Sequence, residues 1–221
     1  MKITRGKDYI QKLVAIPGPT PVVKSIQDEM SREIVAFGDP SFIKDYKGLL
    51  SDMMEMWDST GQVFVIAGTG TMAMEMAIAN TMKPGDNVLI VSHGFFGNRF
   101  IEICERRKIN VDVIESERGK IAPVADVEKK LGEKNYQVVT VTHVDTSTGV
   151  AAPIAEIGEM MKKFPQTLYI VDGVCATAGE PEKLNAMNID VILTGSQKAF
   201  GVCPGLAILW QTRKPWIDEN P

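Results

Sequence analysis

Residues 68–71 read Gly-Thr-Gly-Thr and stand between an apolar run at 63–67 and a helical pattern over 72–82. Glycine at such a turn lets backbone N–H groups and the positive end of the helix meet an anion, and the threonine hydroxyls add donors. A phosphate group fits this arrangement. No Gly-Lys-Thr follows, so the turn is not a P-loop, and it lacks the third glycine of the dinucleotide fingerprint. Taken alone, the pattern also fits a turn that needs glycine only for its backbone conformation.

Asp172 directly follows the apolar run at 168–171. A carboxylate at the C-terminal end of a parallel strand stands where open α/β sheets bind their ligands. Burying it there costs free energy unless a cationic group meets it. The alternative is an aspartate that only caps the next segment.

Lys198 ends the sequence Gly-Ser-Gln-Lys at 195–198, which follows an apolar run at 191–194 and precedes Ala-Phe-Gly. A lysine walled by apolar and small residues is a candidate for a desolvated amine that forms an imine with an aldehyde. A surface lysine in a loop is the commoner alternative. Together, the turn at 68–71, Asp172 and Lys198 match the phosphate, ring nitrogen and aldehyde of pyridoxal 5′-phosphate (PLP).

The elements that must position these residues form an alternating pattern of strands and helices. The apolar segments with strand character are 63–67, 88–92, 111–115, 138–142, 169–172 and 191–194. Helical patterns between them predict an α/β fold with a mostly parallel sheet between helices, a three-layer αβα arrangement. A seventh run at 206–210 follows too soon for a helical crossover, so we expect it to pair antiparallel or to follow a tight turn.

Two proline-containing pairs predict helix starts. Thr20 before Pro21, and Asp39 before Pro40, each place a capping side chain ahead of a proline suited to a first helical turn. After the second pair, apolar residues recur at the spacing of a single helix face, namely Phe42, Tyr46, Leu49, Leu50, Met53 and Trp57.

Composition narrows the class of protein. The chain has 221 residues, 44% of them hydrophobic, and a formal net charge of −4. No basic run suggests nucleic acid or an anionic membrane, and no apolar run approaches the roughly 20 residues of a spanning helix. The N-terminus does not resemble a signal peptide. The 3 cysteines lack CxxC pairing and only 2 histidines occur, so we expect a soluble, cytoplasmic protein without a metal site.

The chain resembles the class V aminotransferase family of fold-type I PLP enzymes, especially its alanine-glyoxylate and serine-pyruvate branch. The resemblance covers residues 17–199, and its motifs match in order and spacing. The matching stretches are Pro-Gly-Pro-Thr-Pro at 17–21, Gly-Thr-Gly-Thr at 68–71, Gly-Phe-Phe-Gly-Asn-Arg at 94–99, Thr-His-Val-Asp-Thr-Ser-Thr-Gly at 142–149, Val-Asp-Gly-Val at 171–174, and Gly-Ser-Gln-Lys-Ala at 195–199.

This resemblance implies a role for each matching residue. Lys198 would hold the cofactor as a Schiff base and act as the proton shuttle, and Asp172 would pair with the pyridinium nitrogen. Phe96 would stack on the ring, Thr146 would hydrogen-bond near the phenolic oxygen, and the phosphate would be held by Thr69, Gly70, Thr71 and Gln197. Gly18, in the Pro-Gly-Pro turn, would lie near the substrate carboxylate. His143 is interpreted as structural.

The chain also departs from the family. Phe96 stands where a tryptophan is common, and Thr71 stands where some members have histidine, which leaves the substrate less defined than the cofactor. Family members continue into a C-terminal small domain that supplies an arginine for the substrate carboxylate, and this sequence has no segment for it. We therefore expect an N-terminal segment at 1–20 and a PLP-binding large domain at 21–221, which alone would not be a competent enzyme. The resemblance further implies a homodimer.

The resulting functional hypothesis is an aminotransferase that moves an amino group from a small amino acid, such as serine or alanine, to glyoxylate or pyruvate by a ping-pong mechanism. One alternative is a cysteine desulfurase-like PLP lyase. Such enzymes typically carry histidines where this chain has Phe96 and Gln197, and Cys203 stands too close to Lys198 to be their nucleophile. The other alternative is a truncated, non-catalytic PLP-binding fragment. The amino donor and the oxo-acid acceptor stay open.

Overall fold

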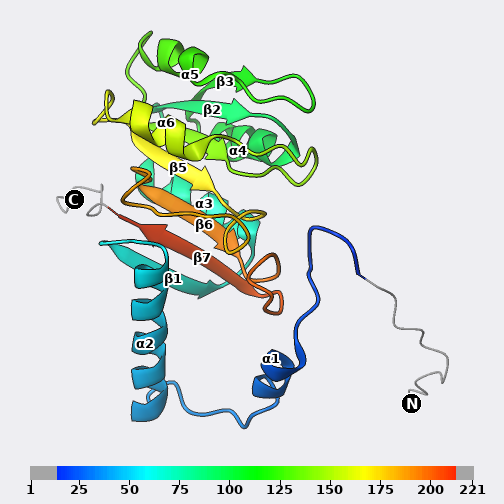
Figure 1. The fold of residues 1–221 in the computed structure, drawn as a ribbon. Helices are drawn as coiled ribbons and strands as arrows, with labels where there is room; N and C mark the ends of the chain where they lie inside the picture. Colours follow the sequence, from blue (N-terminus) through cyan, green and yellow to red (C-terminus); the bar gives the residue numbers. More distant parts are fainter. Residues whose placement is uncertain (1–13, 213–221) are drawn as a thin grey trace.

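The computed structural model of the chain describes residues 14–212, which form one seven-stranded sheet flanked by helices (Figure 1). Residues 1–13 of the expected N-terminal segment and residues 213–221 of the expected large domain lie outside the described part. Within residues 14–212, no helix combines the length and the apolar character that crossing a membrane requires.

All seven predicted strands are present, with bounds close to those expected. They are β1 (Gln62–Ala67), β2 (Asn87–Ser92), β3 (Asn110–Glu115), β4 (Val138–Thr142), β5 (Leu168–Asp172), β6 (Val191–Gly195) and β7 (Leu206–Gln211). The spatial order is β1-β7-β6-β5-β4-β2-β3. The five strands β3, β2, β4, β5 and β6, named here in spatial order, pair in parallel. Strand β7 runs antiparallel to both β6 and β1. The expectation for the run at 206–210 is thus confirmed.

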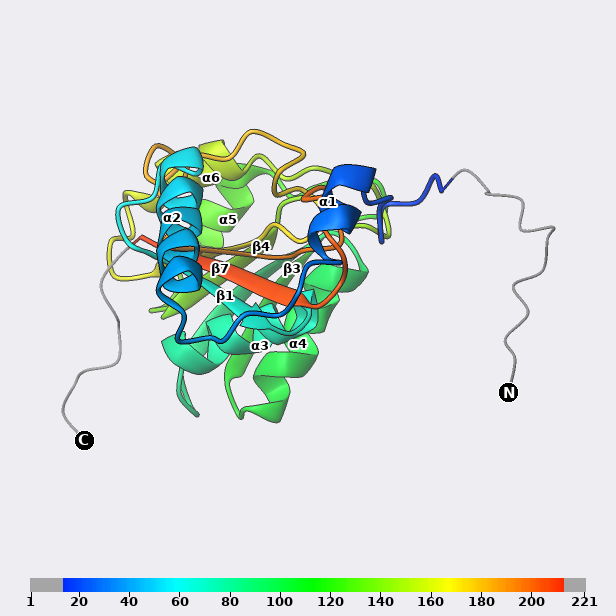
Figure 2. The same cartoon turned by 90° about the horizontal axis from the view of Figure 1, so that it is seen from below.

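Helices cover both faces of the sheet, which confirms the three-layer arrangement. One face carries α2 (Pro40–Met56), α5 (Val124–Leu131) and α6 (Ile154–Met161), and the other carries α3 (Gly70–Thr81) and α4 (Phe95–Arg106). Figure 2 shows the two helical layers on opposite sides of the strands. Every residue of β4, β5 and β6 is buried, because helices cover these central strands on both sides.

The capping prediction is confirmed at Asp39 and wrong at Thr20. Asp39 is the N-cap of α2, and its carboxylate accepts a hydrogen bond from the Ser41 amide at 2.8 Å. The first helix, α1 (Lys24–Glu29), has Val23 as its N-cap and no side-chain cap. The Thr20 hydroxyl donates instead to the carbonyl oxygen of Lys198 at 2.7 Å, so its hydrogen-bonding capacity serves a tertiary contact.

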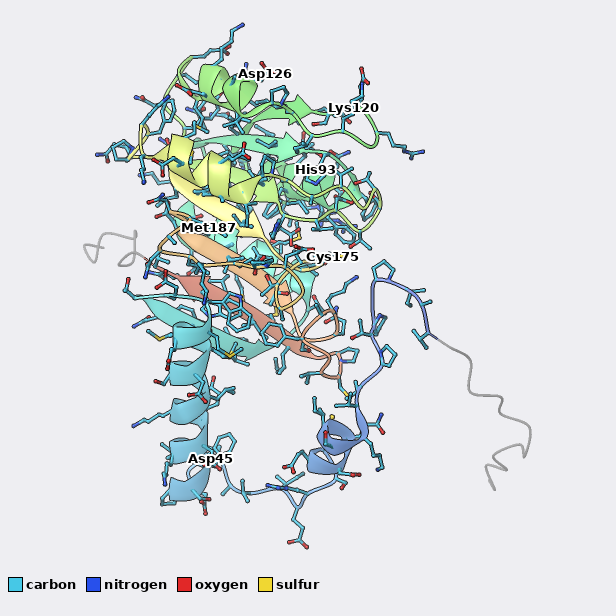
Figure 3. The ribbon with its side chains drawn as sticks, viewed as in Figure 1. Asp45, His93, Lys120, Asp126, Cys175 and Met187 are labelled. Carbon is cyan, nitrogen blue, oxygen red and sulfur yellow. The ribbon has the colours of Figure 1, made fainter. Side chains whose placement is uncertain are left out.

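The predicted apolar face of α2 is buried only at its C-terminal end. Met53 and the following Trp57 are 5% and 6% exposed, whereas Phe42 and Leu49 are 42% and 46% exposed. The helix extends beyond the sheet (Figure 1), and Asp45 in its first half lies well away from the strands (Figure 3). The first turns of α2 therefore have no sheet to pack against, although their spacing is that of a core-facing helix.

Candidate active site

The C-terminal ends of the parallel strands bring the three predicted groups to one edge of the sheet. Asp172 ends β5, where it pairs in register with Thr142 of β4 and with Leu193 of β6. Lys198 follows β6 directly. The start of α3 lies against the same place, because a Cβ on Gly195 would stand only 3.3 Å from the amide nitrogen of Gly70. The parallel strands point toward the side along which residues 14–23 run (Figure 1).

The turn at 68–71 is the beginning of α3, which starts two residues earlier than expected. Thr69 is the N-cap, and its hydroxyl accepts from the Met72 amide at 3.2 Å. The amides of Gly70 and Thr71 donate to no protein acceptor within residues 14–212. Such open amides at the positive end of a twelve-residue helix suit an anionic group.

Gln197 borders this helix start. A Cβ on Gly195 would lie 2.9 Å from the Gln197 side-chain oxygen, so a larger residue at 195 would displace that amide. Gly70 is equally constrained, since a Cβ there would stand 2.9 Å from a methyl group of Val174. Because Gly70 and Gly195 have no side chains, the start of α3, the end of β6 and the Gln197 side chain can lie close together.

Asp172 is a buried carboxylate with no ion-pair partner in the described part of the chain. Its side chain is 1% exposed, and Oδ1 accepts from the Val174 amide at 2.9 Å. Burial raises the pKa of Asp172 to about 6, and the charge of Asp145 adds to the rise. The Val174 hydrogen bond and the charge of Lys198 act in the opposite direction. A cation placed beside this carboxylate would relieve the cost of its burial.

Lys198 is 9% exposed, and its amine has no hydrogen-bonding partner among residues 14–212. Gly18 lies against its side chain, because a Cβ on Gly18 would stand 3.1 Å from Cε. The Gly18 backbone has φ 154°, a conformation that favours glycine. Thr20 holds the lysine backbone through its hydroxyl, and its amide donates to the carbonyl oxygen of Gln197 at 2.9 Å. The segment around Gly18 therefore packs against the aliphatic part of the Lys198 side chain.

Phe96 and Thr146 come from the two neighbouring strand ends. Phe96 lies in the first turn of α4, after β2, and Thr146 lies in the turn after β4. Both are half-buried. The carboxylate of Asp145, which sequence reasoning did not single out, accepts from the Phe96 amide at 2.8 Å and so connects the two segments.

His143 forms a buried polar cluster with Glu182 and Trp57. The His143 Nδ1 lies 2.8 Å from Glu182 Oε1, and the Trp57 indole donates to Glu182 Oε2 at 3.3 Å. Trp57 in turn stacks on Phe200, with ring centroids 5.3 Å apart. Sequence reasoning missed Glu182, because its partners are remote along the chain. The cluster supports the structural interpretation of His143.

We expect Glu182→Ala to lower the free energy of unfolding by about 3 kcal/mol, because it leaves both the His143 ring nitrogen and the Trp57 indole without their buried partner. Urea titration of the full-length protein measures this loss. Glu180→Ala, an exposed change on the same loop, is the matched control and should stay within about 0.5 kcal/mol of the wild type. Equal stabilities of the two variants would contradict the assignment.

Comparisons with known proteins bear on this site. The sequence profile of the family described as Aminotransferase class-V matches residues 49–216. An uncharacterized aminotransferase of Methanocaldococcus jannaschii is 37% identical over 96% of this chain and 56% of its own length. Alanine–glyoxylate aminotransferase 1 of Saccharomyces cerevisiae is 33% identical over 87% of this chain and 52% of its own length. The chain thus spans about half the length of these curated relatives.

A solved structure agrees with the sequence matches. The ureidoglycine–glyoxylate aminotransferase of Bacillus subtilis superposes with a TM-score of 0.86 at 30% identity, covering 89% of this chain and 51% of that one. The likeness therefore extends over nearly all the described strands and helices.

Proposed function

The chain belongs to the class-V aminotransferase family, whose enzymes depend on PLP, and from this premise we propose that the whole protein is an aminotransferase. It moves an amino group from a small amino acid to a small 2-oxo acid. One observation carries the proposal: within residues 14–212, Asp172 is buried without an ion-pair partner, at the same sheet edge as a buried lysine and the open amides of α3.

The residues present fit PLP at each of its ends. Asp172 offers a buried carboxylate whose pKa is raised chiefly by burial, and a protonated ring nitrogen would place a cation beside it. Gly70, Thr71 and Gln197 offer donors for the phosphate, with Thr69 holding the helix start. Phe96 would stack on the ring, and Thr146 would hydrogen-bond near the phenolic oxygen. The family resemblance implies these two roles, and both residues follow the ends of neighbouring strands.

The chain's own residues account for binding and proton transfer. Lys198 would hold the cofactor through Nζ, and the same amine would take the proton from the substrate Cα. When bound, PLP supplies the electron sink that accepts the electron pair left on Cα. Asp172 would keep the proton on the ring nitrogen, and the segment around Gly18, which packs against the Lys198 side chain, would border the space for the substrate carboxylate.

We favour glyoxylate as the acceptor, because the relatives from S. cerevisiae and B. subtilis are named as glyoxylate aminotransferases. Alanine and serine are the donors to test. The experiment uses the full-length holoenzyme, with each donor and glyoxylate varied in turn and glycine measured as the product. We expect parallel double-reciprocal lines, as a ping-pong cycle requires. Sulfide release from cysteine, or no glycine from any small amino acid, would contradict the proposed function.

We also propose a homodimer in the cytoplasm. Apolar side chains exposed along residues 14–49 support a second copy covering this region, since Ile34 and Phe37 are 100% and 91% exposed. Light scattering of the full-length protein measures this state directly. The three cysteines form no disulfide, which agrees with a reducing compartment. We further propose an N-terminal segment at 1–20 and a cofactor-binding domain at 21–221; in the described part, the Thr20 hydrogen bonds to the backbone of Gln197 and Lys198 support a contact between the two.

A further inference from the structure

We propose that Asp145 is a positioning residue for the cofactor, because its carboxylate fixes the start of α4 and the turn after β4, and thereby the placement of Phe96 and Thr146. The inference rests on the proposed function. It assigns to Asp145 a task that acts through the segments of Phe96 and Thr146.

The Asp145 carboxylate is fully buried and accepts hydrogen bonds from two segments at once. Its Oδ2 accepts from the amides of Phe96 at 2.8 Å and Gly97 at 3.2 Å. Its Oδ1 accepts from the Ser147 amide at 2.9 Å and the Ser147 hydroxyl at 2.6 Å. Each oxygen therefore serves one segment, and no cation is among the donors.

Helix α4 depends on this remote carboxylate for its cap. Its own N-cap is Gly94, which has no side chain to accept the first amides. Asp145 takes that role across the sheet, where its charge also suits the positive end of the helix. Gly94 leaves the room for it, since a Cβ there would stand 2.7 Å from Asp145 Oδ2. The position of the Phe96 backbone is thus set by a residue of another strand end.

The turn that carries Thr146 is built around the same residue. The Asp145 carbonyl oxygen accepts from the Gly149 amide at 2.8 Å, and the Asp145 amide donates to the Val150 carbonyl oxygen at 3.2 Å. Ser147 adds a second connection, because its hydroxyl also accepts from the Phe95 amide at 3.0 Å. Thr146 lies between the two anchored residues and cannot shift without breaking these bonds.

Asp145 also acts on the charge of Asp172. Burial raises the pKa of Asp145, but hydrogen bonds from Ser147, Phe96 and Gly97 outweigh this effect and lower it below its ordinary value. The residue therefore stays ionised at neutral pH. Its charge contributes to the raised pKa of Asp172. The carboxylate that holds the segments of Phe96 and Thr146 thus also raises the cost of ionising Asp172, which a cationic partner would offset.

The test measures PLP affinity of the apo form of the full-length protein and the visible circular dichroism of the bound cofactor. Asp145→Asn keeps the size but cannot accept from both segments, and we expect affinity to fall at least about tenfold with a weaker dichroism signal. Asp126→Asn is the control, because Asp126 lies in the first turn of α5, far from β5 and β6 (Figure 3), and should change neither readout.

A double-mutant cycle separates positioning from general stability. In a Phe96→Ala background, Asp145→Asn should weaken affinity by less than about threefold, because much of its effect passes through that ring. If Asp145→Asn fails to fold, Ser147→Ala replaces it as the test variant, because it removes the hydrogen bond from the Ser147 hydroxyl to Asp145 Oδ1. We expect this variant to bind PLP about threefold more weakly. Wild-type affinity in the variant that folds, or full additivity with Phe96→Ala, overturns the inference. Failure of the wild-type protein to bind PLP overturns the proposed function instead.

Discussion

Lys198→Ala is expected to reduce transamination at least about 1,000-fold in the full-length enzyme, because one change removes both the covalent anchor and the group that moves the Cα proton. Lys198 suits both tasks. It is 9% exposed, and its amine is not engaged by any other residue of the described chain. Lys198→Arg should be as inactive, because a guanidinium stays protonated and forms no imine.

The assay compares initial rates of glycine formation with alanine and glyoxylate as substrates. Lys183→Ala is the matched control, since that lysine is exposed and donates only to the Met56 carbonyl oxygen. It should keep the wild-type rate. Borohydride reduction of the holoenzyme followed by peptide mapping should place the cofactor label on Lys198. A label on another lysine would show that the site assignment is wrong, even if the aminotransferase activity were confirmed.

The strands could be predicted from the sequence because the central ones are buried on both faces. Helices cover β4, β5 and β6 from both sides, so each is a short apolar run that composition alone reveals. The brief connection between β6 and β7 was enough to predict that the run at 206–210 pairs antiparallel or follows a tight turn, and it pairs antiparallel with β6. That β7 also pairs with β1 could not be predicted, because periodicity carries no information about which strands become neighbours.

The predictions that were wrong concern tertiary partners. The spacing of Phe42 and Leu49 predicts a packed face, but the first turns of α2 extend past the sheet. Thr20 has the local signature of a helix cap, yet its hydroxyl bonds to the carbonyl oxygen of Lys198. The helix after Asp39 forms as predicted, whereas the helix after Thr20 begins only at Lys24. In each case the tertiary contacts of the residue decide its environment, and the local sequence pattern carries no information about them.

The candidate site divides in the same way. Asp172 and Lys198 could be predicted because each directly follows an apolar strand, and parallel strands end at a common edge. Asp145 and Glu182 could not, because their partners Phe96 and His143 are tens of residues away. Asp145 lies within a recognisable motif, but only the folded chain reveals that its carboxylate spans two segments.

The raised pKa of Asp172 makes the stability of the apo protein depend on pH. Burial raises the pKa to about 6 from 3.8, so the folded state holds a proton over a range in which the unfolded chain has lost it. Such a carboxyl costs nothing well below pH 3.8, progressively destabilises the fold as the pH rises from about 4 to about 6, and reaches its full cost above that range. At neutral pH the cost is about 3 kcal/mol, and a cation bound beside the carboxylate would offset it.

Asp172→Asn should therefore act in opposite directions on activity and stability. The amide cannot keep the ring nitrogen protonated, so we expect turnover to fall at least about 100-fold and PLP to bind more weakly. Without PLP, the variant should be more stable than the wild type by up to about 3 kcal/mol near pH 7.5 and nearly equal near pH 3, since only the wild type buries a charge at the higher pH. Urea titrations of both apo proteins at the two pH values measure this difference, with Asp126→Asn as the exposed control.

A variant that is less stable than the wild type near pH 7.5 and keeps normal turnover would show that Asp172 only caps the segment after β5, because its carboxylate already accepts from the Val174 amide.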